Sequence, residues 1–360
     1  MKIRENVPLA PLTTFGVGGK ARFFIEAASD EEIHEVISFA RKQALPLFIL
    51  GGGSNIVVAD GGFNGVVLVM RASSIEYEDH GDMVTVTADA GVVWDDLVAD
   101  TVNRGYVGLE CLSGVPGTVG GAVVANIGAY GAQCSDTFMK AEVIDLKDVN
   151  ALRTFDKEAC LFSYHDSTFA REPGRFVITR VVFALTANGA SRPTYKDNRF
   201  NLAEFAAKNG REPSLSDIRD AVLDVREQKG ALSMKDRASY KCAGSFFHMP
   251  FVSARQYKEV EARAQVLDAA KEERLRPWAW EQADGSFKLA PGFLLEYTEF
   301  QKGYVRGSVG ISPKHTLTII NVANASAEDI AQLARDMQYA VEKMFDVHLE
   351  REVEYIGEVD

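Results

Sequence analysis

The sequence predicts an α+β protein that is divided into two or three domains. The chain has 360 residues, of which 46% are hydrophobic, and this length exceeds that of a typical single domain. Within the first 70 residues, one helical segment and three strand segments follow one another, as in a small α+β unit. Further strand and helix patterns continue to residue 345 without an internal repeat.

The first helix is expected directly after Ser29. Ser29 and Glu32 have the spacing of a capping box, in which each side chain accepts a hydrogen bond from the other residue's backbone. Apolar residues follow on one helical face, at Ile33, Val36, Ile37 and Ala40. The strands of this unit are expected at residues 45–50, 56–58 and 66–70.

Later elements are indicated by the same patterns. Strands are expected at residues 83–90, 142–146, 176–186 and 316–322, and helices after Ser214, around 255–275 and from Ser326 to Phe345. The polar, basic stretch 226–241 predicts a domain boundary or a mobile loop.

The composition limits the classes of partner and compartment. There are 39 Lys and Arg against 51 Asp and Glu, a net charge of −12, which disfavours nucleic acid as a partner and means that an anionic ligand needs a locally positive pocket. No run of about 18 apolar residues and no apolar signal core is present, so we expect a cytoplasmic protein without a membrane partner. The four cysteines are widely spaced, which indicates neither a disulfide framework nor a metal site.

Glycine is concentrated in two short segments. Twelve of the 30 glycines fall within residues 51–65 and 114–131. Such segments let backbone N–H groups approach a phosphate closely, although two tight turns would explain them equally well. A dinucleotide GxGxxG starting at Gly51 would need glycine in place of Ile56, and a Walker A motif ending at Lys20 would need glycine in place of Thr14. Any nucleotide is therefore held by a different fold.

Short motifs between residues 14 and 357 occur in the order found in one known family. They are Thr14-Phe15-Gly16, residues 50–55, Gly108-Leu109-Glu110, residues 115–122 and 126–131, Tyr164-His165-Asp166-Ser167, residues 243–247, Lys314-His315, Asn321 and residues 351–357. Together they resemble the UDP-N-acetylenolpyruvoylglucosamine reductases, the flavoenzymes of peptidoglycan precursor synthesis. One of these motifs alone would be weak evidence, whereas the ordered set is highly specific.

The resemblance implies a fold and an activity. The implied fold is the vanillyl-alcohol-oxidase-like (PCMH-type) fold, with FAD-binding subdomains at residues 1–71, joined by 347–360, and 72–228, and a substrate-binding domain at 229–346. The implied activity is transfer of a hydride from NADPH through FAD to the enolpyruvyl ether of UDP-N-acetylglucosamine, which yields UDP-N-acetylmuramate. We expect a monomer whose partner is this small UDP-sugar.

The resemblance also assigns binding residues. Those implied for FAD are Gly51, Gly52, Gly53, Ser54, Asn55, Pro116, Gly117, Thr118, Gly120, Gly121, Asn126, Gly128, Ala129 and Tyr130. Those implied for the substrate are Tyr164, Tyr195, Lys229 and Glu296, with Lys235, Arg237 or Lys241 as alternatives to Lys229 for the pyrophosphate. Tyr195 could equally be a packing residue, and Glu296 could be structural.

Three catalytic residues are implied: Ser245, Glu352 and His165. Adding hydride to an enol ether conjugated with a carboxylate builds negative charge, which needs fixed hydrogen-bond donors and an acid to protonate the carbanion. Ser245 matches the family's proton donor. Glu352 matches its catalytic glutamate, with Glu350 and Glu354 as competing assignments.

His165 occupies the position at which the family has an arginine. A protonated His165 could replace it, Arg171, Arg175 or another arginine could reach the site, or the enzyme could be slow or altered. His248 and Met249 also replace the usual Lys-Asn pair, and Cys242 stands where asparagine is common. These departures leave two alternatives open: a flavin oxidase or dehydrogenase of the same fold acting on another substrate, and a nucleotide-binding homologue with weakened or lost turnover.

Overall fold

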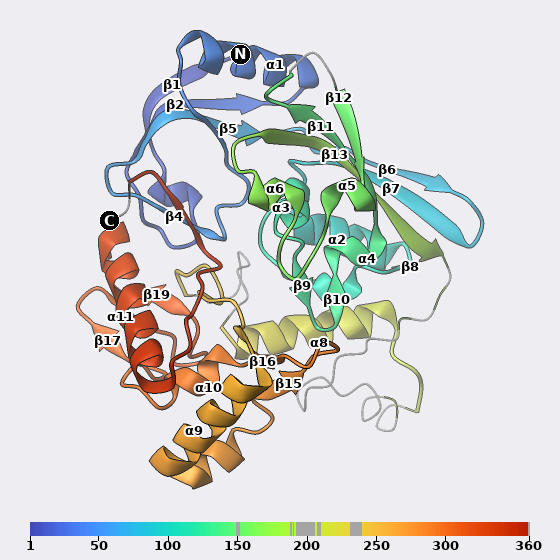
Figure 1. Cartoon of the computed structure of the whole chain (residues 1–360). Coiled ribbons are helices and arrows are strands. Elements are labelled where there is room, and N and C mark those ends of the chain that lie inside the picture. The colour runs from blue at the N-terminus through green and yellow to red at the C-terminus, as the bar shows by residue number, and fades with distance from the viewer. Residues whose placement is uncertain are drawn as a thin grey trace. The chain divides into compact units, whose positions relative to one another are not determined.

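The computed structural model describes residues 1–148, 152–187, 189, 191, 206, 210–230 and 240–358, and the chain forms two compact units (Figure 1). The first unit comprises Met1–Val7, Ala21–Gly53 and the described part of Asn64–Ser239. The second comprises Pro8–Lys20, Ser54–Phe63 and the described part of Tyr240–Asp360. The chain therefore crosses between the units several times.

The first unit contains a four-stranded sheet in the order β1-β2-β5-β3, in which β3 and β5 are parallel. Its strands are β1 (Ile3–Pro8), β2 (Lys20–Ala27), β3 (Leu47–Ile49) and β5 (Phe63–Met70). Helix α1 (Asp30–Lys42) buries the four apolar residues predicted for its inner face, and they join the same hydrophobic core as β5.

A six-stranded sheet forms the rest of this core, in the order β12-β11-β13-β7-β6 with β8 paired to β13. Its strands are β6 (Ile75–Asp79), β7 (Met83–Asp89), β8 (Tyr106–Val107), β11 (Phe138–Asp145), β12 (Leu152–Asp156) and β13 (Phe176–Ala187). Alternate residues of β7 are buried, at Val84, Val86 and Ala88, as its strict apolar alternation predicts.

Short helices follow the loops of this sheet, and Figure 1 shows α3, α5 and α6 gathered on one side of it. The elements are α2 (Trp94–Asn103), η2 (Glu110–Leu112), α3 (Val119–Val124), the hairpin β9 (Gly128–Ala129) and β10 (Ala132–Gln133), α4 (Cys134–Thr137), α5 (Lys157–Cys160), α6 (Thr168–Arg171) and α8 (Leu215–Gln228). Helix α8 contacts α2 and η2, so it lies against the start of the second glycine segment.

The second unit is built on small sheets around helix α11. Its elements are η1 (Ala10–Leu12), β4 (Ile56–Val58), β14 (Phe251–Val252), α9 (Ala254–Arg274), β15 (Ala279–Glu281), β16 (Phe287–Leu289), α10 (Pro291–Leu295), β17 (Val305–Arg306), β18 (Val309–Ile311), β19 (Ile319–Asn321), α11 (Ala327–Phe345) and β20 (Glu354–Ile356). The last strand, β20, pairs in parallel with β4, about 300 residues earlier in the chain.

Local sequence patterns predicted several of these elements correctly. The helices predicted after Ser214 and Ser326 begin with capping boxes at Ser214–Asp217 and Ser326–Asp329, and α11 buries its predicted apolar face. At Ser29 half of the box forms: the Ser29 side chain accepts from the Glu32 backbone, whereas the Glu32 carboxylate accepts from the Ala28 N–H at 2.8 Å.

Two expectations need revision. The strand predicted at 316–322 is confined to β19, because the Thr318 N–H donates to the His315 carbonyl in a turn. Residues 1–70 do not close into one unit, since β4 pairs with β20 in the second unit. The three-domain division at 71/72 and 228/229 is finer than the two units and stays a prediction. Within the described residues, no helix combines the length and apolarity needed to cross a membrane.

Candidate active site

The two glycine segments lie against each other in the first unit. A Cβ atom on Gly52 would lie 2.5 Å from the Gly117 Cα, and one on Gly51 would lie 3.1 Å from the Thr118 Oγ1. Gly51 and Gly52 are exposed on their other side, so side chains are absent where the two backbones meet and where a ligand would approach. The second segment continues into α3, whose first residue follows Thr118. The predicted pair of glycine loops is therefore one structural feature.

Asn126 holds the end of the second glycine segment. It is 1% exposed and has a positive φ of 38°. Its side-chain nitrogen donates to the Ser163 carbonyl at 2.7 Å, and its side-chain oxygen accepts from the Ser135 N–H at 3.0 Å. Asn126 therefore fixes the loop from inside the unit and ties it to the segment that carries His165.

His165 lies beside the second glycine segment. A Cβ on Gly128 would lie 3.8 Å from the His165 Nε2, and the rings of Tyr164 and His165 meet edge to face with centroids 4.5 Å apart. His165 has a φ of 50°, a left-handed conformation that histidine tolerates better than most residues. The next motif residue, Ser167, is buried and donates to the Val124 carbonyl at 2.6 Å. These contacts place the His165 ring next to the segment predicted to hold the cofactor.

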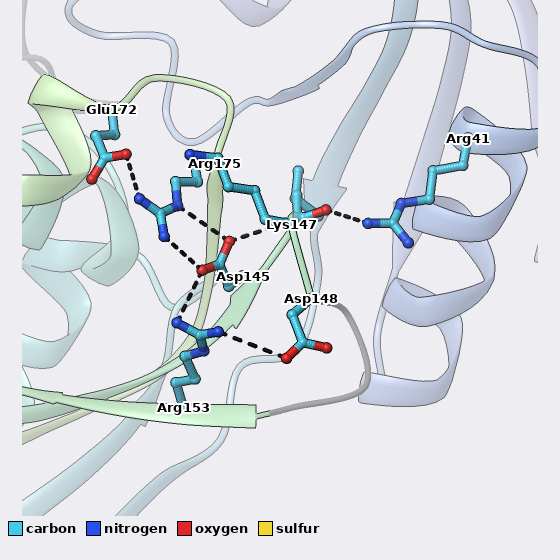
Figure 2. Close-up of polar contacts among 8 residues, drawn as sticks. Arg41, Asp145, Lys147, Asp148, Arg153, Glu172 and Arg175 are labelled. Carbon is cyan, nitrogen blue, oxygen red and sulfur yellow. Dashed lines mark hydrogen bonds and ion pairs between the residues drawn. The ribbon is translucent and has the colours of Figure 1, made fainter.

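The two arginines considered as substitutes for His165 have carboxylate partners of their own. Arg171 pairs with Asp166 and donates to the Leu161 carbonyl at 2.7 Å. Arg175 donates to Asp145 at 2.9 Å and to Glu172 at 2.5 Å (Figure 2). Each of these guanidinium groups therefore already holds an ion pair.

Lys229 is the C-cap residue of α8, and its Nζ lies 5.2 Å from the centroid of the Tyr130 ring. Burial by itself would raise the Asp95 pKa, but the bidentate pair with Arg219, at 2.7 Å for both contacts, and the Gly114 N–H lower it below its usual value. Asp95 thus joins α8 to the second glycine segment. Tyr195, Lys235 and Arg237 lie outside the described residues.

Ser245 and Glu352 come from distant parts of the chain and lie on or next to segments that pair in the second unit. The Glu352 N–H donates to the Phe246 carbonyl at 3.0 Å, the His248 N–H donates to the Glu350 carbonyl at 2.9 Å, and Phe247 and Arg351 form an antiparallel bridge. The segment after Gly244 therefore runs alongside the segment that carries Glu352. Two segments that carry predicted catalytic residues, separated by more than 100 positions, are thus neighbours through backbone pairing.

The Glu352 carboxyl lies in a partly enclosed environment. Burial raises its pKa to about 7, so it is substantially protonated near neutral pH. The Asn55 side chain donates to the Glu352 carbonyl at 3.0 Å, and the Asn55 carbonyl accepts from the Glu354 N–H at 3.1 Å. Asn55, predicted for the cofactor, therefore also fixes the backbone on both sides of Val353.

Two further predicted residues have structural contacts in the second unit. The Glu296 carboxylate accepts from the Thr316 hydroxyl at 3.0 Å, and Glu296 is the C-cap of α10. Lys241 pairs with Asn321 through the backbone, and its side chain lies against Gly16, where a Cβ would be 3.4 Å from the lysine Cδ. The motif residues at Gly16, Lys241 and Asn321 are thus brought together.

Residues that anchor these features were missed in the sequence. Asp95 and Arg219 are 124 positions apart, and no local pattern links them. His248 was recognised as unusual, but its neighbour Glu352 could not be inferred from spacing. Its Nδ1 lies 3.8 Å from the Glu352 Oε2.

Comparison with known proteins matches both parts of the chain to described families. Residues 21–154 match an FAD binding domain, and residues 236–356 match the C-terminal domain of UDP-N-acetylenolpyruvoylglucosamine reductase. The reductase of Thermobifida fusca is 38% identical over 98% of both chains, and that of Pseudomonas putida is 35% identical over 97% of both. The chain belongs to the UDP-N-acetylenolpyruvoylglucosamine reductase family.

The fold agrees with this membership. The structure of the reductase from Thermus caldophilus superposes with a TM-score of 0.64 at 24% identity, covering 99% of this chain and all of that one. The predicted α+β, PCMH-type fold is therefore confirmed, and the chain is a flavoprotein of this reductase family. The facing, side-chain-free backbones of Gly51, Gly52 and Gly117 fit an FAD phosphate approaching closely.

Proposed function

We propose that the protein reduces the enolpyruvyl group of UDP-N-acetylglucosamine to give UDP-N-acetylmuramate, with NADPH as the reductant. The observation that supports this proposal is the backbone pairing of the segment after Gly244 with the segment that carries Glu352, together with a Glu352 pKa that burial raises to about 7. FAD, when bound, supplies the hydride carrier between NADPH and the substrate. The protein's residues supply the proton and the charge stabilisation.

The proton chemistry falls to Ser245 and Glu352. Hydride addition to the terminal carbon leaves a carbanion next to the substrate carboxylate, which is basic enough to take a proton from the Ser245 hydroxyl. A neutral Glu352 can donate a hydrogen bond to the developing negative charge, whereas an ionised one would repel it. Since its pKa is about 7, a substantial fraction of Glu352 is in the protonated form at neutral pH.

Recognition of the anionic ligands is assigned to the predicted substrate and cofactor residues. His165 with Tyr164 is proposed to face the substrate carboxylate, and Lys229 to face the pyrophosphate. Tyr195 and Glu296 are proposed as further substrate contacts. The cofactor residues are proposed to be the two glycine segments with Ser54, Asn55, Pro116, Thr118, Asn126, Ala129 and Tyr130. We propose that the protein acts as a cytoplasmic monomer whose partner is a small UDP-sugar.

An NADPH assay with the defined substrate tests the proposal. Purified protein, reconstituted with FAD where needed, is mixed with NADPH in the presence and absence of enolpyruvyl-UDP-N-acetylglucosamine, and absorbance at the NADPH band is followed. Consumption that depends on the substrate supports the proposal. Consumption coupled to oxygen without the substrate would favour an oxidase of the same fold, and a protein unable to take up FAD would refute both.

A further inference from the structure

Asn55 contacts the backbone of the segment that carries Glu352, inside the second unit. Its side-chain Nδ2 donates to the Glu352 carbonyl at 3.0 Å, and its own carbonyl accepts from the Glu354 N–H at 3.1 Å. Asn55 and Glu352 are 297 positions apart, and both belong to the second unit. One residue at the end of the first glycine segment therefore makes two hydrogen bonds to the segment of a proposed catalytic residue.

These two hydrogen bonds continue the parallel pairing of β4 with β20 by one position. The first paired residues of the two strands are Ile56 and Glu354. In a parallel ladder, a residue accepts a hydrogen bond from one neighbour of its partner and donates one to the other neighbour. Asn55 does this on either side of Val353, with its side-chain amide as the donor. The Glu352 carbonyl is thereby bonded although it lies just before β20.

Both main-chain polar groups of Glu352 are held by these contacts. Its N–H donates to the Phe246 carbonyl at 3.0 Å, and its carbonyl accepts from the Asn55 amide at 3.0 Å. A residue that is bonded on both sides keeps its backbone conformation, so its side chain leaves the backbone in one direction. Without the Asn55 amide, the Glu352 carbonyl loses this partner and its peptide group gains freedom to turn.

The charged groups around the Glu352 carboxyl come from two segments. Its own segment carries Glu350, Arg351 and Glu354, whereas β4 carries no charged side chain. On the segment after Gly244, the His248 Nδ1 lies 3.8 Å from the Glu352 Oε2, and a charged imidazolium there would favour the ionised carboxyl. Burial acts in the opposite direction and raises the Glu352 pKa to about 7. The protonated form therefore depends on the carboxyl staying enclosed.

We propose that Asn55 is a positioning residue, which keeps the Glu352 side chain enclosed by hydrogen-bonding the Glu352 backbone carbonyl. This inference rests on the proposed function only for its catalytic consequence. An asparagine side chain supplies an N–H donor at this distance from the backbone, and alanine supplies none. Loss of the donor lets the Glu352 segment shift and admits water to the carboxyl, which lowers the Glu352 pKa toward its usual 4.5.

A titration that needs no turnover tests the positioning. In the FAD-loaded protein without substrate, the infrared carbonyl band of the protonated Glu352 carboxyl is followed against pH and assigned by its loss in Glu352→Gln. Asn55→Ala should lower the midpoint by about one pH unit. The matched control is Asn321→Ala, which removes another side-chain amide of the second unit, the donor to the Phe15 carbonyl at 2.9 Å, and should leave the midpoint in place. An unchanged midpoint in Asn55→Ala, or an equal shift in both variants, would overturn the proposal.

A pH profile of flavin reoxidation tests the catalytic consequence. Relative to its own reduction by NADPH, reoxidation of Asn55→Ala by the substrate should slow about fivefold at about pH 7, where a midpoint lowered by one unit leaves less Glu352 protonated, and recover near about pH 5. An equal loss at all pH values would refute the positioning role.

Asn55→Ser repeats both measurements if Asn55→Ala does not fold, because its hydroxyl lies nearer the backbone and stops short of the Glu352 carbonyl. Failure of the unaltered protein to reduce the substrate would instead refute the proposed function, while the infrared titration still decides whether Asn55 positions Glu352.

Discussion

Replacing Ser245 with alanine removes the hydroxyl proposed to protonate the substrate and keeps the backbone contact between Phe246 and Glu352. We expect Ser245→Ala to be reduced by NADPH at the normal rate, because that step needs no proton from the side chain. Reoxidation by the enolpyruvyl substrate should slow by about 100-fold or more. Stopped-flow absorbance of the flavin measures both steps separately, and equal slowing of the two would contradict the proton-donor assignment.

His165 lies at the position where the family has an arginine, so substitutions here test whether a histidine can serve the same function. We expect His165→Arg to preserve or raise activity, because arginine is a permanently charged planar donor. His165→Gln, which cannot be charged, should lose activity. The measurement is kcat/KM for the enolpyruvyl substrate across pH. Loss of activity in the arginine variant would show that histidine has a role of its own.

The contact between the two glycine segments depends on Gly52. Gly52→Ala would bring a methyl group within 2.5 Å of the Gly117 Cα, and backbone cannot yield as a side chain does. We expect the segments to be pushed apart, with a loss of about 1–3 kcal/mol in stability and weaker flavin retention. The control is Gly61→Ala, since a Cβ at Gly61 meets nothing within 4 Å. The ratio of flavin to protein absorbance, with thermal unfolding, decides the outcome, and equal behaviour of both variants would refute the contact.

Asp145 ties the end of β11 to two neighbouring segments. It is 1% exposed, and Arg175 and Arg153 donate to it at 2.9 and 3.2 Å (Figure 2). Hydrogen bonds from Arg175, with that of the Lys147 N–H, lower the Asp145 pKa from 3.8 to about 2. A lowered carboxyl pKa stabilises the fold above the unfolded value, and this contribution is lost as pH falls through about 2.

We therefore expect Asp145→Asn to lower the free energy of unfolding by about 2 kcal/mol at neutral pH. The difference should shrink between about pH 4 and pH 2, where the native carboxyl becomes protonated. Asp148→Asn is the matched control, because Asp148 is 54% exposed and lies 3.7 Å from Arg153. Urea unfolding at several pH values gives the comparison. A pH-independent deficit in Asp145→Asn would show that the charge is not the cause.

Helices with local signals were predictable, and those without were not. The α8 and α11 boundaries follow from Ser-x-x-Asp caps that act within four residues. Helix α2 was missed because its N-cap, Val93, has no side-chain oxygen to accept a backbone hydrogen bond. The pairing of the Ser245 and Glu352 segments is non-local, so residue patterns alone could not predict it, and the resemblance to a known family supplied it.

The path of the whole chain explains why the first 70 residues do not form a single unit. Strand β4 follows the first glycine segment at once and pairs with β20, so the boundary between the units falls between Gly53 and Ser54. Gly51 to Gly53 therefore belong to the first unit, whereas Ser54 and Asn55, predicted for the same cofactor segment, belong to the second. Hydrophobic periodicity and composition predict individual helices and strands, but they do not show where the chain passes from one unit to the other.

The net charge of −12 makes the location of each cation matter more than the total. NADPH and the UDP-sugar are polyanions, and an acidic exterior repels them unless a local field outweighs it. Lys229 is fixed near Tyr130 at the end of α8, which Asp95 and Arg219 anchor. We expect Lys229→Gln to raise the KM for the enolpyruvyl substrate about tenfold, as for loss of one charge-assisted hydrogen bond.

Lys42→Gln changes the net charge by the same amount at the exposed end of α1 and should leave KM unaltered at physiological salt, since distant surface charges are screened over about 8 Å. Steady-state kinetics at two salt concentrations separates the two contributions. A similar rise in KM for both variants would mean that the ligands respond to the overall charge of the protein. A rise for Lys229→Gln alone, diminished at high salt, would show that one placed cation overcomes the acidic background.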